Sequence, residues 1–335
     1  MINIRRVPIL TGTGDQLVHN DKRLIPNDKL SRMSFRCPFL KNKKREEMGK
    51  ERYEELLKER ELDFDVLEAT TKKHGAIITT AHIELSDGYE DTKPLNQFDK
   101  EVLIACMCDQ QYGNKTTTIN AIYRNLIGSD ESYIKANPHM RKRILESIKR
   151  LIGHIITIDM SKTCKKMGYK LEDYPNGTIT SSILPAMLCE GGMVNGKFTK
   201  DIIKFDRPSP LFVVAQAKHQ IITYAKCILR VPDISNTEQN IIVKNYVLEY
   251  VMGCRAHPRK TIKDIDVGMH PTIVLNKLYK YCDIPPTDRK KTKKARQVLE
   301  NMMKHLVSLE IINSYEFFKE NKDKKTQYTH MRITF

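Results

Sequence analysis

Residues 287–309 read TDRKKTKKARQVLENMMKHLVSL, and residues 311–318 follow as IINSYEFF. Apolar residues recur three or four positions apart in the first segment, which predicts an amphipathic helix. This apolar face consists of Ala295, Leu299, Met302, Leu306 and Leu309. The second segment has the composition of a strand, and apolar and polar residues alternate in residues 327–335. The sequence therefore predicts a basic helix followed by a two-stranded hairpin.

Two further helices are predicted before this basic helix. Residues 236–254 carry an amphipathic pattern, and residues 270–281 predict a short helix with Pro271 at its first position. The order helix, helix, basic helix, strand, turn, strand is that of a winged helix, whose third helix commonly enters the DNA major groove. Residues 236–335 are therefore predicted to form one winged-helix domain.

The same order occurs once earlier in the chain. Helices are predicted at residues 98–112, 117–126 and 141–152, followed by a β-branched strand at 154–159. Asn195-Gly196 is a strong hairpin-turn signal within residues 187–205. We predict a fold that is mainly α with small β-hairpins (α+β), in which two tandem winged-helix domains follow an N-terminal extension. The predicted boundaries are 1–97 for the extension, 98–208 and 236–335 for the winged helices, and 209–235 for a connecting helix.

The N-terminal extension differs from the rest of the chain in its charge. The whole chain of 335 residues has a formal net charge of +16, and nearly all of this excess follows residue 97. Within the extension, residues 41–60 predict a highly charged helix, residues 75–85 a strand and residues 86–97 a polar linker. The excess of positive charge makes a polyanion the first partner to consider.

Several function classes are excluded by missing motifs. The longest uncharged apolar run, near residues 211–217, is far shorter than the roughly 20 residues of a membrane span, and no signal peptide is recognisable. We therefore expect a cytoplasmic protein with no membrane contact. The eight cysteines form no CxxC pair, and all of them, including the closely spaced Cys106 and Cys108, are expected to be small apolar core residues. There is no phosphate-binding loop and no His-x-His pair, so we predict no catalytic residue, no metal and no cofactor, and hence no enzyme.

Basic residues cluster on the two predicted third helices. Such clustering at a helix start opposes the helix dipole, which indicates a role beyond helix stability; a solvated, self-repelling face is the alternative. The candidates on these helices are Arg141, Lys142, Arg143, Lys149 and Arg150, and Arg289, Lys290, Lys291, Lys293, Lys294 and Arg296. Because the planar guanidinium pairs bidentately with guanine, Arg141, Arg143, Arg289 and Arg296 are the predicted base readers, and the lysines are predicted to contact phosphates.

The predicted hairpins supply further basic candidates. Lys319, Lys322, Lys324 and Lys325 lie at the tip of the second hairpin, and Lys197 and Lys200 lie beside the turn of the first. Lys115 and residues 116–118, at the start of a helix, could contact a phosphate, although helix capping explains the threonines equally well.

From residue 98 onward, the sequence resembles plasmid-type replication initiators with two winged helices, the Rep class of plasmids and mobile elements. The resemblance is carried by FDKEVLIACMCDQQYGNKTTTINAIYR, by RKRILESIKRLI running into HIITID, by SPLFVVAQAKHQIITYAKCIL, and by DRKKTKKARQVLENMMKHLVSLEII. It implies binding to repeated double-stranded sites at a replication origin, recruitment of host replication proteins, and a homodimer formed through the first winged helix. Residues 162–182 depart from the common pattern as an insert between the first strand and the hairpin.

The leading hypothesis is thus a sequence-specific double-stranded DNA-binding replication initiator. A transcriptional repressor or regulator with the same two domains would make the same DNA contacts. A non-catalytic RNA- or protein-binding scaffold, whose basic helices serve solubility, is the third hypothesis.

Overall fold

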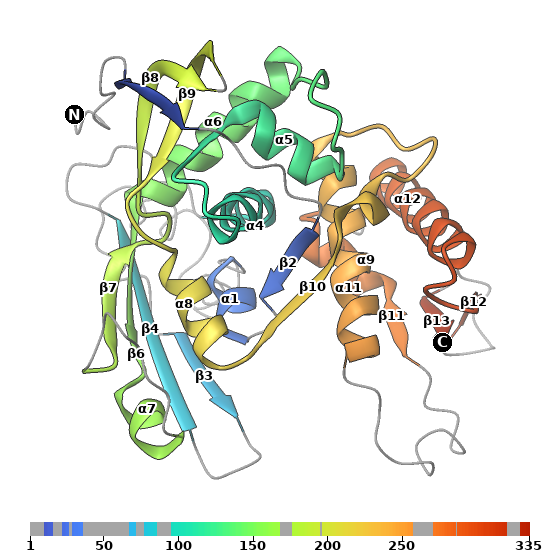
Figure 1. The fold of residues 1–335 in the computed structure, drawn as a ribbon. Helices are drawn as coiled ribbons and strands as arrows, with labels where there is room; N and C mark the ends of the chain where they lie inside the picture. Colours follow the sequence, from blue (N-terminus) through green and yellow to red (C-terminus); the bar gives the residue numbers. More distant parts are fainter. Residues whose placement is uncertain are drawn as a thin grey trace. The chain divides into compact units, whose positions relative to one another are not determined.

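The computed structural model describes residues 10–15, 22–26, 29–35, 67–71, 77–85, 95–167, 176–194, 196–256, 271–285, 287–319 and 329–335 (Figure 1). These residues divide into two compact units. Unit 1 contains the described residues up to Leu126 together with Asp130–Tyr224, and unit 2 contains Ile127–Ser129 and Ala225–Phe335. The helix Lys41–Arg60 expected from the sequence lies outside the described residues.

Unit 1 contains a winged helix. Its helices are α4 (Gln97–Gln111), α5 (Ile119–Ile127) and α6 (Pro138–Gly153), and its strands are β5 (Thr116–Thr118), β8 (Ala186–Val194) and β9 (Lys197–Phe205). The hairpin β8–β9 is antiparallel, and β5 pairs with β9. Gly196 adopts a positive φ of 73°, as a tight hairpin turn requires. The three helices and the hairpin predicted from the sequence are confirmed.

The strand that follows α6 belongs to a second sheet in unit 1. This strand, β6 (His154–Asp159), pairs with β4 (Ile77–Leu85) and β7 (Thr178–Ser182), and β4 also pairs with β3 (Leu67–Thr71). The helix α7 (Ser161–Met167) begins the connection from β6 to β7. The insert at 162–182 therefore completes a separate four-stranded sheet, order β3-β4-β6-β7, and leaves the β8–β9 hairpin intact.

The N-terminal strands are built into unit 1. β1 (Leu10–Asp15) pairs in parallel with β8, β2 (Lys22–Pro26) pairs with β10 (Ile221–Ala225), and a short helix, α1 (Lys29–Ser34), follows β2. The strand predicted at 75–85 is confirmed as β4. Because β1, β3 and β4 complete sheets whose other strands come from later in the chain, this part of the sequence is not the separate extension that we expected.

The single connecting helix predicted at 209–235 is wrong. The structure forms α8 (Pro210–Ala217), then β10, then a 3₁₀ turn, η1 (Lys226–Leu229). His219 has a positive φ of 52°, which ends the helical path. The β-branched residues of β10 then pair with β2, a long-range partner that a local pattern does not reveal.

Unit 2 is a second winged helix with the same order. It consists of α9 (Glu238–Ala256), β11 (Thr272–Val274), α11 (Leu275–Tyr281), α12 (Arg289–Ser308), β12 (Ser314–Phe318) and β13 (His330–Thr334). The sheet order is β11-β13-β12. Pro271 precedes a strand rather than opening a helix, so that prediction is wrong. The core residues include Val247, Leu248, Leu278, Leu299, Met302, Leu306, Met331 and Ile333.

The two units thus share one topology, in which the strand after the first helix pairs with the last strand of the hairpin. The fold class predicted from the sequence, α+β with two tandem winged helices, is confirmed.

Candidate nucleic-acid interface

The helix α12 begins at a polar cap. Asp288 is the N-cap residue, and its carboxylate accepts a hydrogen bond of 3.0 Å from the backbone N–H of Lys291. This hydrogen bond holds the pKa of Asp288 below its ordinary value. The cap places a negative charge at the helix start, where it offsets the unfavourable position of the basic cluster that follows.

The residues of α12 that follow the cap form a buried apolar face and an exposed basic face. Ala295, Leu299, Met302 and Leu306 are buried in unit 2. The exposed basic side chains are Arg289, Lys290, Lys291, Lys293 and Lys294 in its first turns and Lys304 near its end. The helix therefore presents its positive charge to solvent, at the place where a winged helix carries its recognition helix.

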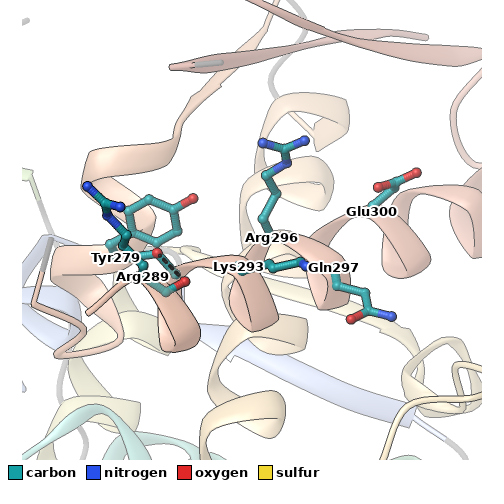
Figure 2. Close-up of a pocket in the computed structure, with 7 residues that line it drawn as sticks. Tyr279, Arg289, Lys293, Arg296, Gln297 and Glu300 are labelled. Carbon is teal, nitrogen blue, oxygen red and sulfur yellow. Dashed lines mark hydrogen bonds between the residues drawn. The ribbon is translucent and has the colours of Figure 1, made fainter. Parts of the chain in front are cut away.

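A hollow of about 630 Å³ lies along this basic face (Figure 2). It is lined by Tyr279 of α11 and by Arg289, Thr292, Lys293, Arg296, Gln297 and Glu300 of α12. Most of these α12 residues recur three or four positions apart, which places them on one side of the helix. The hollow combines guanidinium, ammonium, amide and carboxylate groups, which are the groups that read base edges and phosphates.

Arg296 has an aromatic neighbour. Its guanidinium carbon lies 5.4 Å from the centroid of the Phe317 ring, and Figure 2 shows Arg296 and Glu300 projecting to the same side of α12. Burial raises the pKa of Tyr279, and the positive charge of Arg296 partly opposes that rise. Contact with an aromatic face limits the motion of a long side chain, so Arg296 is positioned before any ligand arrives.

The acid in this region is neutralised locally. Glu300 Oε1 lies 3.1 Å from Lys304 Nζ one turn later, and this pair raises the pKa of Lys304. In the second hairpin, Arg332 of β13 pairs with Glu316 of β12 at 2.9 Å. The guanidinium carbon of Arg332 also lies 5.0 Å from the ring centroid of Phe318. Lys319 is exposed at the end of β12, whereas the predicted candidates Lys322, Lys324 and Lys325 lie outside the described residues.

In unit 1, Arg150 does not reach solvent. It is 2% exposed, and its Nη2 and Nε atoms lie 2.7 and 3.0 Å from the carboxylate oxygens of Asp99 in α4. Ser147 donates a further hydrogen bond of 2.6 Å to the same carboxylate. The prediction that Arg150 contacts DNA is wrong, because this side chain joins α6 to α4 inside the core.

The other two arginines of α6 are paired with acids. Arg141 Nη2 lies 2.6 Å from Asp201 Oδ2, and Arg143 Nη1 lies 2.9 Å from Glu146 Oε2. A base contact by either arginine would have to replace an existing ion pair. Lys142 is exposed and Lys149 is half-buried on the same helix.

The remaining candidates of unit 1 lie on strands. Lys197 and Lys200 are exposed on β9, and Lys115 is exposed just before β5. The threonines of β5 are buried; Thr117 donates a hydrogen bond to Asp109, and Thr118 Oγ1 accepts one of 3.2 Å from the backbone N–H of Ala121. For Thr118, the structure supports the capping alternative.

Sequence reasoning missed four residues of the α12 hollow. Tyr279, Thr292, Gln297 and Glu300 line it beside the predicted Arg289, Lys293 and Arg296. Thr292, Gln297 and Glu300 could have been found from their helical spacing relative to Arg289 and Arg296, whereas nothing in the sequence places Tyr279 of α11 there.

The described residues contain neither a metal centre nor a membrane span. Within these ranges, no group of three or more His, Cys, Asp or Glu side chains could hold a metal ion, and no helix is both long and apolar enough to span a bilayer. Cys106, Cys108, Cys189 and Cys282 are buried, as expected, and burial raises the pKa of the Cys106 thiol. Cys227 is exposed, so the expectation of a core residue is wrong for this cysteine.

The strand and helix order defines both units as winged helices, so the chain is a tandem winged-helix protein. No protein-family model and no curated protein sequence matches it. Two solved structures of domains 2 and 3 of RctB are similar, one from selenomethionine derivatives and one of RctB residues 155–483. They are 13% and 12% identical, each with a TM-score of 0.39 over 81% of this chain and 91% of the other. The assignment of the fold rests on the element order alone.

Proposed function

We propose that this chain is a sequence-specific double-stranded DNA-binding protein whose second winged helix inserts α12 into the major groove. The observation that carries the proposal is the exposed basic face of α12, with the hollow at Arg289 and Arg296. The major groove is about 12 Å wide and admits one α-helix. A basic helix at the third position of a winged helix has both the shape and the charge for it.

The side chains of the hollow divide by chemistry. Arg289 and Arg296 match guanine O6 and N7, and Gln297 matches adenine N6 and N7. Lys290, Lys291, Lys293 and Lys294, which are exposed around the helix start, suit phosphate oxygens, as does Lys319 on the wing. On this assignment the arginines supply specificity and the lysines supply most of the affinity.

In the cell, we propose that the protein is a replication initiator that binds repeated origin sites and recruits host replication proteins. The support is the tandem winged-helix order together with the sequence resemblance to plasmid-type initiators from residue 98 onward. The first winged helix is assigned chiefly to dimerisation and protein contacts, since the three arginines of its helix α6 are paired with acids. No catalytic step is assigned to the chain.

Salt titration with duplex DNA tests the binding proposal. If six to ten phosphates are contacted, the logarithm of the association constant should fall with log salt at a slope of about −5 to −9. A slope near zero contradicts DNA binding and favours the scaffold hypothesis.

An origin-dependence assay separates an initiator from a repressor. A plasmid that carries this gene and its flanking repeats should replicate in a host that lacks the plasmid's usual initiator. Regulation of a neighbouring promoter without replication would instead identify a transcriptional regulator. The repeats should recur at about 20 bp, because two turns of B-DNA place successive copies on one face of the duplex.

A further inference from the structure

The tip of the β8–β9 hairpin exposes an apolar pair. Met193 and Phe198 are directly opposite each other in the antiparallel register, and their exposed fractions are 43% and 55%. They stand beside the turn at Gly196. The proposed role of α12 in DNA binding does not use these two exposed apolar side chains.

The ring of Phe198 is held in place by the strand opposite. A Cβ atom at Gly191 would lie 2.7 Å from Phe198 Cζ, so the ring rests against the bare backbone of that glycine. Gly191 and Met193 share one face of β8, and their cross-strand partners are Lys200 and Phe198. The tip therefore presents the aromatic ring of Phe198, which packs against Gly191. The thioether of Met193 lies on the opposite strand, and Lys200 follows two residues after Phe198 on β9.

The surroundings indicate a polyanion as the occupant. Lys197 and Lys200 are both exposed on β9, next to the apolar pair. Apolar side chains such as Phe and Met, when flanked by basic residues, are used as wedges that enter the minor groove and separate two stacked base pairs. The neighbouring lysines are suitable partners for the phosphates on the two sides of such a groove.

A second copy of the chain is a poorer occupant of this tip. The two side chains together expose on the order of 200 Å², whereas stable protein interfaces bury about 1,200–2,000 Å². The backbone edge of β8 near the tip is already paired with β1, in the register Leu10 to Gly192 and Asp15 to Val194. That edge is therefore occupied and does not offer a site for adding a strand.

We propose that the β8–β9 tip is a minor-groove wedge, in which Phe198, supported by Gly191 and Met193, inserts between base pairs and bends the duplex. This proposal rests on the proposed DNA-binding function and assigns the first winged helix a DNA contact separate from α12. Wedges of this kind bend DNA by about 20–90° toward the major groove. The chemical class of ligand is a double-stranded, deformable DNA segment.

The absence of tryptophan from the chain makes a direct test possible, because Phe198→Trp introduces the only indole, which can be excited at wavelengths where tyrosine does not absorb. A mixed-sequence duplex of about 40 bp, four helical turns, is titrated at low salt. We expect the indole emission to be quenched by base stacking and its access to acrylamide to fall in the complex. The matched control is Tyr133→Trp, at an exposed loop position of the same unit, where neither signal should change.

The same duplex, labelled at both ends, reports bending by energy transfer. Phe198→Ala should abolish the bend and weaken binding roughly five- to a hundredfold, the range for loss of one base–aromatic stack. Phe198→Leu, which keeps an apolar wedge, should retain a bend, whereas Tyr133→Ala should behave as the unaltered protein.

Three results would overturn the wedge. In the first, the complex forms while the indole at position 198 stays as accessible as in the free protein. In the second, the indole is shielded from acrylamide in the absence of DNA, and sedimentation shows that the protein mass has doubled. This result would mean that the tip binds a second copy of the chain. In the third, no complex forms with duplex at any salt concentration, which would also remove the proposed DNA-binding function; the first two results leave that function intact.

Discussion

The helices α6 and α12 hold the same place in their winged helices but use their arginines differently. On α6, Arg141, Arg143 and Arg150 are each paired with a carboxylate, and Arg150 is buried. On α12, Arg289 is exposed, and Arg296 lies over the Phe317 ring beside a hollow. Position in the fold therefore does not by itself make a recognition helix. The two helices differ in that Arg141 and Arg150 of α6 are paired with acids of other elements, Asp201 and Asp99, whereas Arg289 and Arg296 of α12 line a hollow.

Unit 1 supplies such acids from two directions. Asp99 lies on the buried helix α4, and Asp201 lies on β9 with a positive φ of 53° that marks an irregular point in the strand. Among the described residues, two acids of α12 itself contact its basic side: Asp288, the cap, and Glu300, which pairs with Lys304. In the proposed function, α6 is therefore chiefly a structural helix and α12 is the helix that reads the DNA.

The largest effect is expected for Arg150→Ala. Removing the guanidinium leaves the buried carboxylate of Asp99 without its cation, and breaking a buried pair in this way costs about 3–5 kcal/mol of unfolding free energy. Urea unfolding followed by circular dichroism measures the loss.

The matched control for Arg150 is Lys142→Ala, an exposed position on the same helix whose change should stay within about 0.5 kcal/mol. A stable Arg150→Ala protein with weakened DNA binding would reverse the roles assigned to the two helices.

A somewhat smaller loss is expected for Arg23→Ala in β2. Arg23 is buried, pairs with Glu101 of α4 at 2.7 Å and donates a hydrogen bond of 2.9 Å to the carbonyl of Asn125. We expect the unfolding free energy of unit 1 to fall by about 3 kcal/mol. An unchanged urea midpoint would mean that the N-terminal strands are dispensable to this winged helix.

Sequence reasoning recovered the local part of the fold. The three helices of each unit follow from apolar residues at three-to-four spacing, and the first hairpin follows from Asn195-Gly196. The short strands β5 and β11 were missed, because three residues carry no detectable period and are fixed only by pairing with β9 and β13. The pairing of β2 with β10 was missed because the two strands are far apart in the sequence, and a connecting helix was predicted in place of β10.

The sequence identified the basic residues of the candidate site but did not show which of them are paired with acids. Arg289 and Arg296, the predicted base readers of α12, line the hollow, because the buried face of α12 fixes which side of the helix is exposed. Arg150 follows the same basic pattern as Arg143, and only the position of Asp99 in space separates a core ion pair from a surface charge. A charge count along a helix therefore identifies candidates without telling which of them are already paired.

An intermediate effect is expected for Arg296→Ala. If Arg296 reads a guanine, its loss should cost about 1–3 kcal/mol of binding free energy and relax the preference at one base pair. Affinity for a panel of single-base variants of the bound site, measured by fluorescence anisotropy, gives both quantities.

The matched control for Arg296 is Arg141→Ala, which removes an arginine already paired with Asp201 and should leave the base preference unchanged. Equal loss of preference from both variants would mean that α6 reads bases as well.

The smallest effect is expected for Lys290→Ala, compared with Lys142→Ala at the start of α6. Both lysines are exposed near the start of the third helix of their unit, so their solvation is similar. The proposed difference between them is that Lys290 contacts a phosphate and Lys142 does not. A lysine that neutralises one phosphate contributes about 0.9 to the slope of log affinity against log salt. Lys290→Ala should therefore lower the slope by about one and weaken every duplex to the same extent, whereas Lys142→Ala should leave the slope unchanged. If both variants lower it equally, the two helices contact the backbone alike, and the contrast between them is confined to their arginines.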